Sequence, residues 1–140
     1  MREYLFKGKR LDNGEWIEGD LSQDRDLGKA YIHGYDYYTD ECGLQREPFE
    51  FEVDPETVGP FTGATDAVGT KIFDGDIIWD GDWECVGEIQ WTEDYLSWMV
   101  VMAGGEIEWF QEFVSTKSKK AGSSKVIGNR WDNPELLEGV

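Results

Sequence analysis

The stretch that decides the fold is Lys71-Ile72-Phe73-Asp74-Gly75-Asp76-Ile77-Ile78-Trp79-Asp80, in which apolar residues flank an acid-glycine-acid centre. The chain is predicted to bend here and to enter a strand. Glycine tolerates a positive φ or a close approach of the backbone, so we expect Gly75 to serve the fold and not an activity. We also expect Asp74→Asn and Asp76→Asn to change stability little or to raise it, because each change lowers like-charge repulsion.

The residues that follow continue as short strands with apolar side chains at every second position. One predicted strand face carries Cys85, Gly87, Ile89 and Trp91, and the next carries Leu96, Trp98 and Val100. Further strands are predicted at Ile107–Phe113 and at Lys125–Gly128. Five short strands within about 60 residues, joined by tight turns, fit a small closed barrel of the SH3-like kind. A short C-terminal helix is expected to begin after Asn133, with Asn133 as its cap and Pro134 in its first position.

The part of the chain before this barrel is predicted to be a β-hairpin region. Asn13-Gly14 is a strong hairpin turn signal, and Phe49–Val53 alternates strictly between apolar and acidic residues, as a half-buried strand does. The Tyr- and Asp-rich stretch Tyr35–Asp40 is predicted to be a loop. The expected fold is therefore mainly β, with the hairpin region in residues 1–53 and the barrel with its short helix in residues 54–140.

The charge is strongly negative and unevenly placed. The formal net charge is −17, and residues 47–116 carry seventeen acidic groups against one lysine, which gives −16. Such a field repels phosphates and anionic membranes, so we expect neither direct nucleic acid binding nor membrane binding, whereas a basic protein is attracted. No stretch approaches the roughly 20 apolar residues that span a bilayer, and the start lacks the apolar run of a secretion signal. A cytoplasmic location is expected.

The two cysteines, Cys42 and Cys85, are far apart in the sequence, and neither belongs to a CxxC motif. In a reducing cytosol such cysteines are expected to be small buried apolar groups. One disulfide between them is the alternative.

Three segments carry a resemblance to a known family. They are Glu3–Lys9 with Gly14-Glu15-Trp16 close behind, Thr57–Gly63 leading into Lys71–Ile77, and Val126–Leu137. In order and spacing they resemble the YopX family, small proteins of phages and prophages. The resemblance implies an SH3-like barrel in the C-terminal part and a phage or prophage origin, hence the cytoplasm of a bacterial host. It supplies no catalytic residues.

The densest acidic cluster is the one candidate for a metal site. It consists of Asp74, Asp76, Asp80 and Asp82. Oxygen-rich sites suit calcium or magnesium, and carboxylates crowded on one face would be relieved by a divalent ion. The run lacks the ligand order of an EF-hand, and a solvated rim is the favoured interpretation. No cofactor is expected.

Other chemistry-bearing residues are few. His33 is the single histidine and lies in no catalytic signature, so a structural or surface role is favoured. The basic segment 117–125 lacks the spacing of a P-loop and is predicted to be a flexible loop that folds on the acidic barrel or contacts a partner. Most of the tryptophans are expected to be core, and exposed ones would mark a protein-binding face.

The leading hypothesis is a non-enzymatic phage or prophage accessory protein that binds a host or phage protein through its barrel, with a homo-oligomer as a further option. One alternative is a DNA mimic that inhibits a nucleic-acid-binding protein of the host. Another is a metal-dependent enzyme or a metal-stabilised barrel that uses Asp74, Asp76, Asp80 and Asp82.

Overall fold

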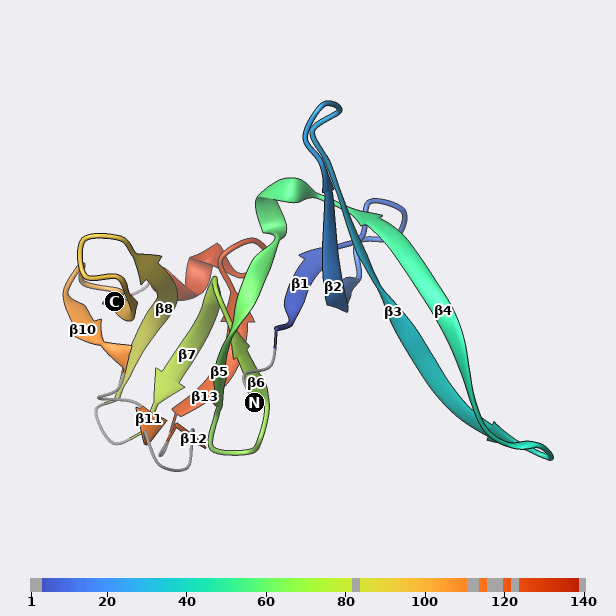
Figure 1. Cartoon of the computed structure of the whole chain (residues 1–140). Helices are drawn as coiled ribbons and strands as arrows, with labels where there is room; N and C mark the ends of the chain where they lie inside the picture. The colour runs from blue at the N-terminus through green and yellow to red at the C-terminus, as the bar shows by residue number, and fades with distance from the viewer. Residues whose placement is uncertain (1–3, 82–83, 111–113, 116–119, 122–123, 139–140) are drawn as a thin grey trace. The chain divides into compact units, whose positions relative to one another are not determined.

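The structure is a computed structural model that describes residues 4–81, 84–110, 114–115, 120–121 and 124–138. The chain divides into two compact units between Pro60 and Phe61, whereas the sequence predicts a domain boundary after Val53. Figure 1 shows a fold built almost entirely of strands. The prediction of a mainly β protein is confirmed.

The N-terminal unit is an antiparallel arrangement of four strands. They are β1 (Phe6–Lys9), β2 (Trp16–Asp24), β3 (Lys29–Asp40) and β4 (Gly43–Val53), followed by the single 3-10 turn η1 (Pro55–Thr57) and the first residues of β5 (Gly59–Thr65). The predicted hairpin turn at Asn13-Gly14 joins β1 to β2: Gly14 has a φ of 74°, and Asn13 Oδ1 accepts a hydrogen bond from the Glu15 N–H at 2.9 Å.

The core of this unit lies on one face of β3 and β4. Ala30, Ile32 and Val53 are fully buried there, and partly buried apolar side chains of the neighbouring elements pack on them: Phe6, Ile17, Leu21, Phe49 and Val58. Alternation along a strand places every second residue on this face, which explains the pattern of Phe49–Val53.

The segment Tyr35–Asp40 is strand, so its prediction as a loop is wrong. It pairs with Gly43–Pro48 through a two-residue turn at Glu41 and Cys42. Neither face of this part of the sheet packs on a core, so both faces are polar or aromatic and the alternation that reveals a strand is missing.

The C-terminal unit contains a five-stranded antiparallel sheet in the order β10-β9-β8-β7-β13. Its strands are β7 (Asp76–Asp80), β8 (Cys85–Thr92), β9 (Ser97–Met102), β10 (Ile107–Trp109) and β13 (Ser124–Asn129). The rest of β5 pairs with β6 (Lys71–Phe73) and, at one position, with β12 (Lys120–Ala121), which in turn pairs with β11 (Val114–Ser115). The chain ends in the 3-10 turn η3 (Pro134–Leu137).

Two details of the predicted barrel need correction. Among the described residues the strand pairings do not close into a ring, so the predicted closed barrel is not found. The expected C-terminal helix is only η3, because Asn133 does not cap it: the Asn133 Oδ1 accepts a hydrogen bond from the Asn129 N–H at 3.3 Å instead.

Buried apolar side chains of β7, β8 and β9 form part of a core cluster in the C-terminal unit. The buried members are Ala64, Ile72, Ile78, Ile89, Val100 and Phe110, with Cys85, Trp98, Met102 and Val126 packed against them. Ile89 and Val100 are directly opposite each other on β8 and β9, as the predicted strand faces require.

Candidate functional site

The β3–β4 hairpin continues as a two-stranded ribbon beyond the sheet that anchors it. β2 pairs with β3 only as far as His33, while β3 and β4 remain paired down to the turn at Asp40 and Gly43. We call residues 34–49 the ribbon (Figure 1). A two-stranded hairpin without a covered face is marginally stable by itself, so this extension adds surface and not core.

Two backbone hydrogen bonds fix which peptide groups of the ribbon point outward. The Leu11 N–H donates to the Glu52 carbonyl at 3.1 Å, and the Asp54 N–H donates to the Lys9 carbonyl at 2.8 Å. The peptide groups of residues 52 and 54 therefore point away from β3, and those of Val53 point toward β3. Antiparallel pairing alternates strictly, so even-numbered residues of β4 and odd-numbered residues of β3 direct their N–H and C=O groups outward.

The same register divides the ribbon side chains between two different faces, because residues directly opposite each other share a face. The tyrosine face consists of Tyr35, Tyr37, Thr39, Leu44, Arg46 and Pro48. The acidic face consists of Asp36, Tyr38, Asp40, Gln45 and Glu47. No carboxylate lies on the tyrosine face.

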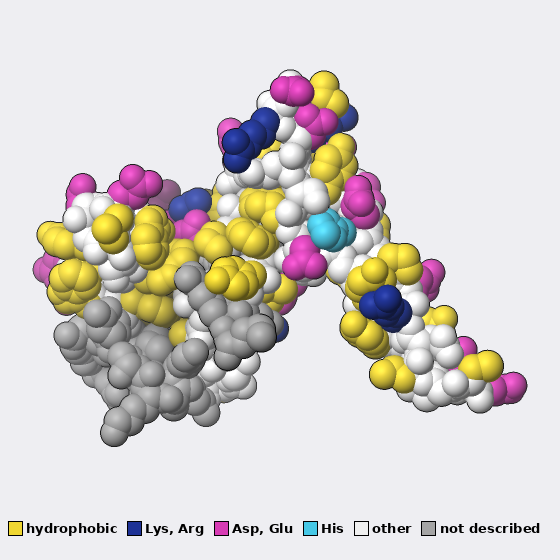
Figure 2. Space-filling model, in the orientation of Figure 1, with side chains coloured by type: hydrophobic (Ala, Val, Ile, Leu, Met, Phe, Trp, Pro, Cys, Tyr) yellow, Lys and Arg dark blue, Asp and Glu magenta, His cyan; other side chains and the backbone are white. Residues whose placement is uncertain are grey.

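All six side chains of the tyrosine face are exposed. Tyr37 keeps 65% of its surface accessible and Leu44 keeps 72%. The Arg46 guanidinium lies 4.2 Å from the centroid of the Tyr35 ring, which is cation–π geometry. Figure 2 shows hydrophobic side chains around a cationic one along the ribbon. Exposed tyrosines beside an arginine are typical of the energetic centre of protein interfaces.

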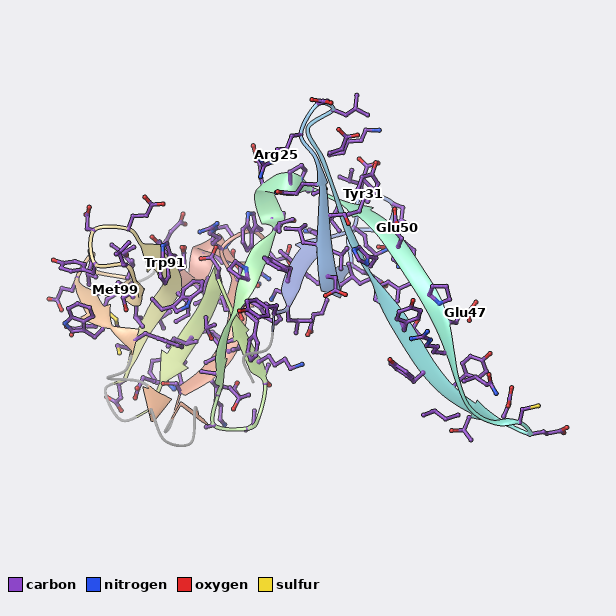
Figure 3. All side chains as sticks on the ribbon, in the orientation of Figure 1. Arg25, Tyr31, Glu47, Glu50, Trp91 and Met99 are labelled. Atoms are coloured by element: carbon purple, nitrogen blue, oxygen red, sulfur yellow. The ribbon has the colours of Figure 1, made fainter. Side chains whose placement is uncertain are left out.

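The acidic face lowers the stability of the ribbon as an isolated strand pair. Asp36 and Glu47 are directly opposite each other, and both are exposed (Glu47 is labelled in Figure 3). Like charges at opposed positions destabilise a strand pair. The ribbon is thus not optimised to be stable as an isolated hairpin.

A groove lies at the base of the tyrosine face, where the ribbon joins the three-stranded part. Its walls include Ser22, His33, Tyr35, Pro48 and Glu50, and its volume is about 550 Å³. Ser22 Oγ and His33 Nε2 are hydrogen-bonded at 3.0 Å. The groove is open and His33 is only partly buried, so the groove continues the exposed surface of the tyrosine face toward β2.

The predicted metal-site carboxylates have other roles. Asp76 is 1% exposed and its Oδ2 accepts a hydrogen bond from the Phe73 N–H at 2.8 Å, while Asp80 Oδ2 accepts one from the Ser124 hydroxyl at 3.1 Å. A solvated rim is therefore wrong for both. Asp82 lies outside the described residues, and the residues that the structure does describe contain no group of three His, Cys, Asp or Glu side chains suited to a metal ion.

Gly75 has the positive φ predicted for it, at 87°. A Cβ built on Gly75 would lie 2.5 Å from two ring carbons of Trp131, and the Arg130 N–H donates to the Gly75 carbonyl at 2.9 Å. Two of the segments that carry the family resemblance therefore meet here. Burial raises the pKa of the neighbouring Asp74, an effect that Arg130 opposes.

The remaining candidates are placed as follows. Cys42 is exposed in the ribbon turn and Cys85 is partly buried; both are free, so burial is wrong for Cys42 and no disulfide joins them. In the predicted basic loop 117–125, residues 117–119 and 122–123 lie outside the described residues, whereas Lys120–Ala121 is strand β12 and residues 124–125 begin β13, so a loop is wrong for those four. Two aromatic side chains of β8–β10 are exposed, Trp91 and Trp109 (Trp91 is labelled in Figure 3).

The sequence prediction missed the ribbon and its exposed tyrosine face. The available signal was the tyrosine content of residues 35–38, since aromatic residues favour strands. The facial separation of tyrosines from carboxylates depends on the cross-strand register, which no local pattern gives.

Comparison with known proteins relates the chain to a protein family and to a solved structure. The family model described as YopX protein matches residues 5–138. The crystal structure of protein EF1440 from Enterococcus faecalis is similar, with a TM-score of 0.55 and 18% sequence identity, covering 99% of this chain and 100% of that chain. At this identity the likeness shows a shared fold. A search among curated proteins gives no match. The described residues include no helix with the length and apolar character that crossing a membrane requires.

Proposed function

This chain belongs to the YopX family, and we propose that it is a non-enzymatic phage or prophage accessory protein that binds another protein through the tyrosine face of its ribbon. The observation that carries the proposal is the register of β3 and β4. It places Tyr35, Tyr37, Leu44 and Arg46 together, all exposed and without a carboxylate among them.

The tyrosine face suits a protein partner for a physical reason. Tyrosine rings bring large apolar contact area with little rotamer entropy to lose, and their hydroxyl groups find hydrogen bonds at a wet rim. Arg46 is held over Tyr35 before binding, so less of its side-chain entropy is lost on association. The ribbon replaces the barrel as the binding element that we favour.

The two alternative functions have less support. DNA mimicry needs carboxylates spaced like phosphates along one extended face. Within the ribbon this spacing is absent, because on its acidic face the opposed pair Tyr38 and Gln45 separates the Asp36–Glu47 pair from Asp40. For a metal-dependent activity, two of the four candidate ligands, Asp76 and Asp80, instead accept hydrogen bonds inside the fold.

A comparison of two tyrosines that differ in face tests the proposal. The immobilised chain, Tyr37→Ser and Tyr38→Ser are each incubated with host lysate at low and at high salt. We expect Tyr37→Ser to retain at least tenfold less of a partner, as hot-spot truncations do, and Tyr38→Ser to retain it as the unchanged chain does. Equal retention by the two variants, or no retained protein at either salt, would count against the proposal.

A further inference from the structure

The outer edge of β3 in the ribbon is open for pairing. Beyond His33, no strand of the described residues pairs with β3 on the side away from β4. The register directs the N–H and C=O groups of Tyr35, Tyr37 and Thr39 toward that side. An unpaired row of this kind is a template for another strand.

The outer edge of β4 is different. The outward-facing positions there are even-numbered, and one of them is Pro48, which lies opposite Tyr35. Proline has no N–H to donate, and on an edge strand it blocks a continuous ladder. The ribbon is therefore protected on one edge and open on the other.

We propose that the occupant of the open edge is the β3 strand of a second copy of this chain, paired antiparallel about a two-fold axis at Tyr37. The proposal rests on the proposed function in using the ribbon as the binding element. In this dimer Tyr37 of each copy faces Tyr37 of the other, and Tyr35 faces Thr39. Three N–H groups from each copy then give six hydrogen bonds across the axis.

The charges of β3 select this register. In any such dimer the odd-numbered residues of the two β3 strands must pair, because their N–H and C=O groups point outward. The two-fold registers next to the one centred on Tyr37 are therefore centred on Asp36 and on Tyr38. The first places Asp36 opposite Asp36, and the second places Asp36 opposite Asp40. The register centred on Tyr37 instead places Asp36 opposite Tyr38 and Asp40 opposite Gly34. Of these three registers it alone opposes no two carboxylates, and opposed like charges destabilise a strand pair.

The dimer also enlarges the surface described above. Directly paired residues share a face, so the two tyrosine faces lie on the same side of a four-stranded sheet in the order β4-β3-β3-β4. The combined face still carries no carboxylate. Pairing through β3 thus leaves the tyrosine face available for a further protein.

The sign of the salt effect separates a second copy from a basic partner. Two chains of net charge −17 repel each other, and salt screens this repulsion. Self-association is therefore strengthened by salt, whereas the binding of a basic protein is weakened by it.

The test is sedimentation equilibrium of the full chain at about 0.05 M and about 0.5 M NaCl, concentrations that change the screening length severalfold. We expect a concentration-dependent dimer that is favoured at high salt. Tyr37→Pro removes an N–H that points away from β4, so the pairing of β3 with β4 keeps all its hydrogen bonds while the pairing between copies is broken. The variant should therefore be a monomer with an unchanged circular dichroism spectrum. Tyr37→Phe keeps both the ring and the N–H and should still dimerise.

A spin label on Cys42 tests the register. In the proposed register, position 42 of one copy lies opposite position 32 of the other copy. Position 42 of that other copy is ten residues further along the strand, so the two labels are about 34 Å apart. The second thiol is removed by Cys85→Ala. A monomer under all conditions, a Tyr37→Pro dimer, or a label distance that fits another register would overturn the proposal. If the chain is monomeric and Tyr37→Ser still loses the lysate partner, the second copy is excluded and the proposed function stands.

Discussion

The replacement of Gly75 by alanine tests how two distant segments of the C-terminal unit fit together. A residue other than glycine at a φ of 87° is strained by roughly 1–2 kcal/mol. The new Cβ would also lie 2.5 Å from two ring carbons of Trp131, and forcing an extra methyl group into a packed site costs about 1–3 kcal/mol. We therefore expect Gly75→Ala to lower the free energy of unfolding by about 2–5 kcal/mol.

Gly69 supplies the matched control. It has a φ of 91°, and a Cβ built on it meets no atom within 4 Å. Gly69→Ala should therefore show the strain alone, roughly 1–2 kcal/mol. In addition, Gly75→Ala should cost less in a Trp131→Leu background than in the unchanged chain, because the branched side chain occupies less of the space above Gly75.

Urea denaturation followed by tryptophan fluorescence measures these differences. Six of the seven tryptophans belong to residues 61–140, so the signal reports mainly on the C-terminal unit. Equal destabilisation by Gly75→Ala and Gly69→Ala, or an effect of Gly75→Ala that does not depend on residue 131, would refute the packing argument.

Three further predictions concern titratable residues. Asp76→Asn should lower the free energy of unfolding by about 1–3 kcal/mol, because the buried Asp76 carboxylate accepts the Phe73 N–H; an unchanged urea midpoint would contradict this. Burial raises the pKa of Asp74 in the folded state, so the folded protein favours the protonated carboxyl. The stability that this protonation contributes is fully present below the unfolded pKa of about 3.9 and is lost as the pH rises through the folded pKa. Asp74→Asn should therefore stabilise the protein at neutral pH, with a gain in urea midpoint that disappears near pH 3–4; a gain independent of pH would refute the assignment. Iodoacetamide should alkylate Cys42 faster than Cys85, whose thiol is partly buried with a pKa raised by that burial; equal rates in mass spectra would contradict this.

The burial of Asp76 also shows where the interpretation of the acidic cluster as a solvated rim was wrong. Asp74 and Asp76 read alike as members of an acidic run. In the structure Asp76 is 1% exposed and accepts the Phe73 N–H, whereas Asp74 is half-buried at the bend. The two carboxylates differ because the bend directs their side chains into different surroundings.

Local chemistry by itself determined the turns and the fold class. Asn13-Gly14 closes a hairpin and Gly75 takes a positive φ because few residues other than glycine are stable in those conformations. The aromatic and β-branched composition was enough to predict a mainly β chain. These features depend on residues close together in the sequence, so the sequence alone reveals them.

The tertiary structure decided which surfaces are exposed and which edges are open. Residues 35–40 lack the alternation of apolar and polar residues that reveals a strand, because no core covers them. They form a strand only through their pairing with residues 43–48. Asp80 is buried because Ser124, 44 positions away, donates to it. The tyrosine face arises in the same way, since the register across β3 and β4 sorts its side chains from the carboxylates. Such outcomes depend on partners that are distant or on opposite strands, and no local sequence pattern encodes them.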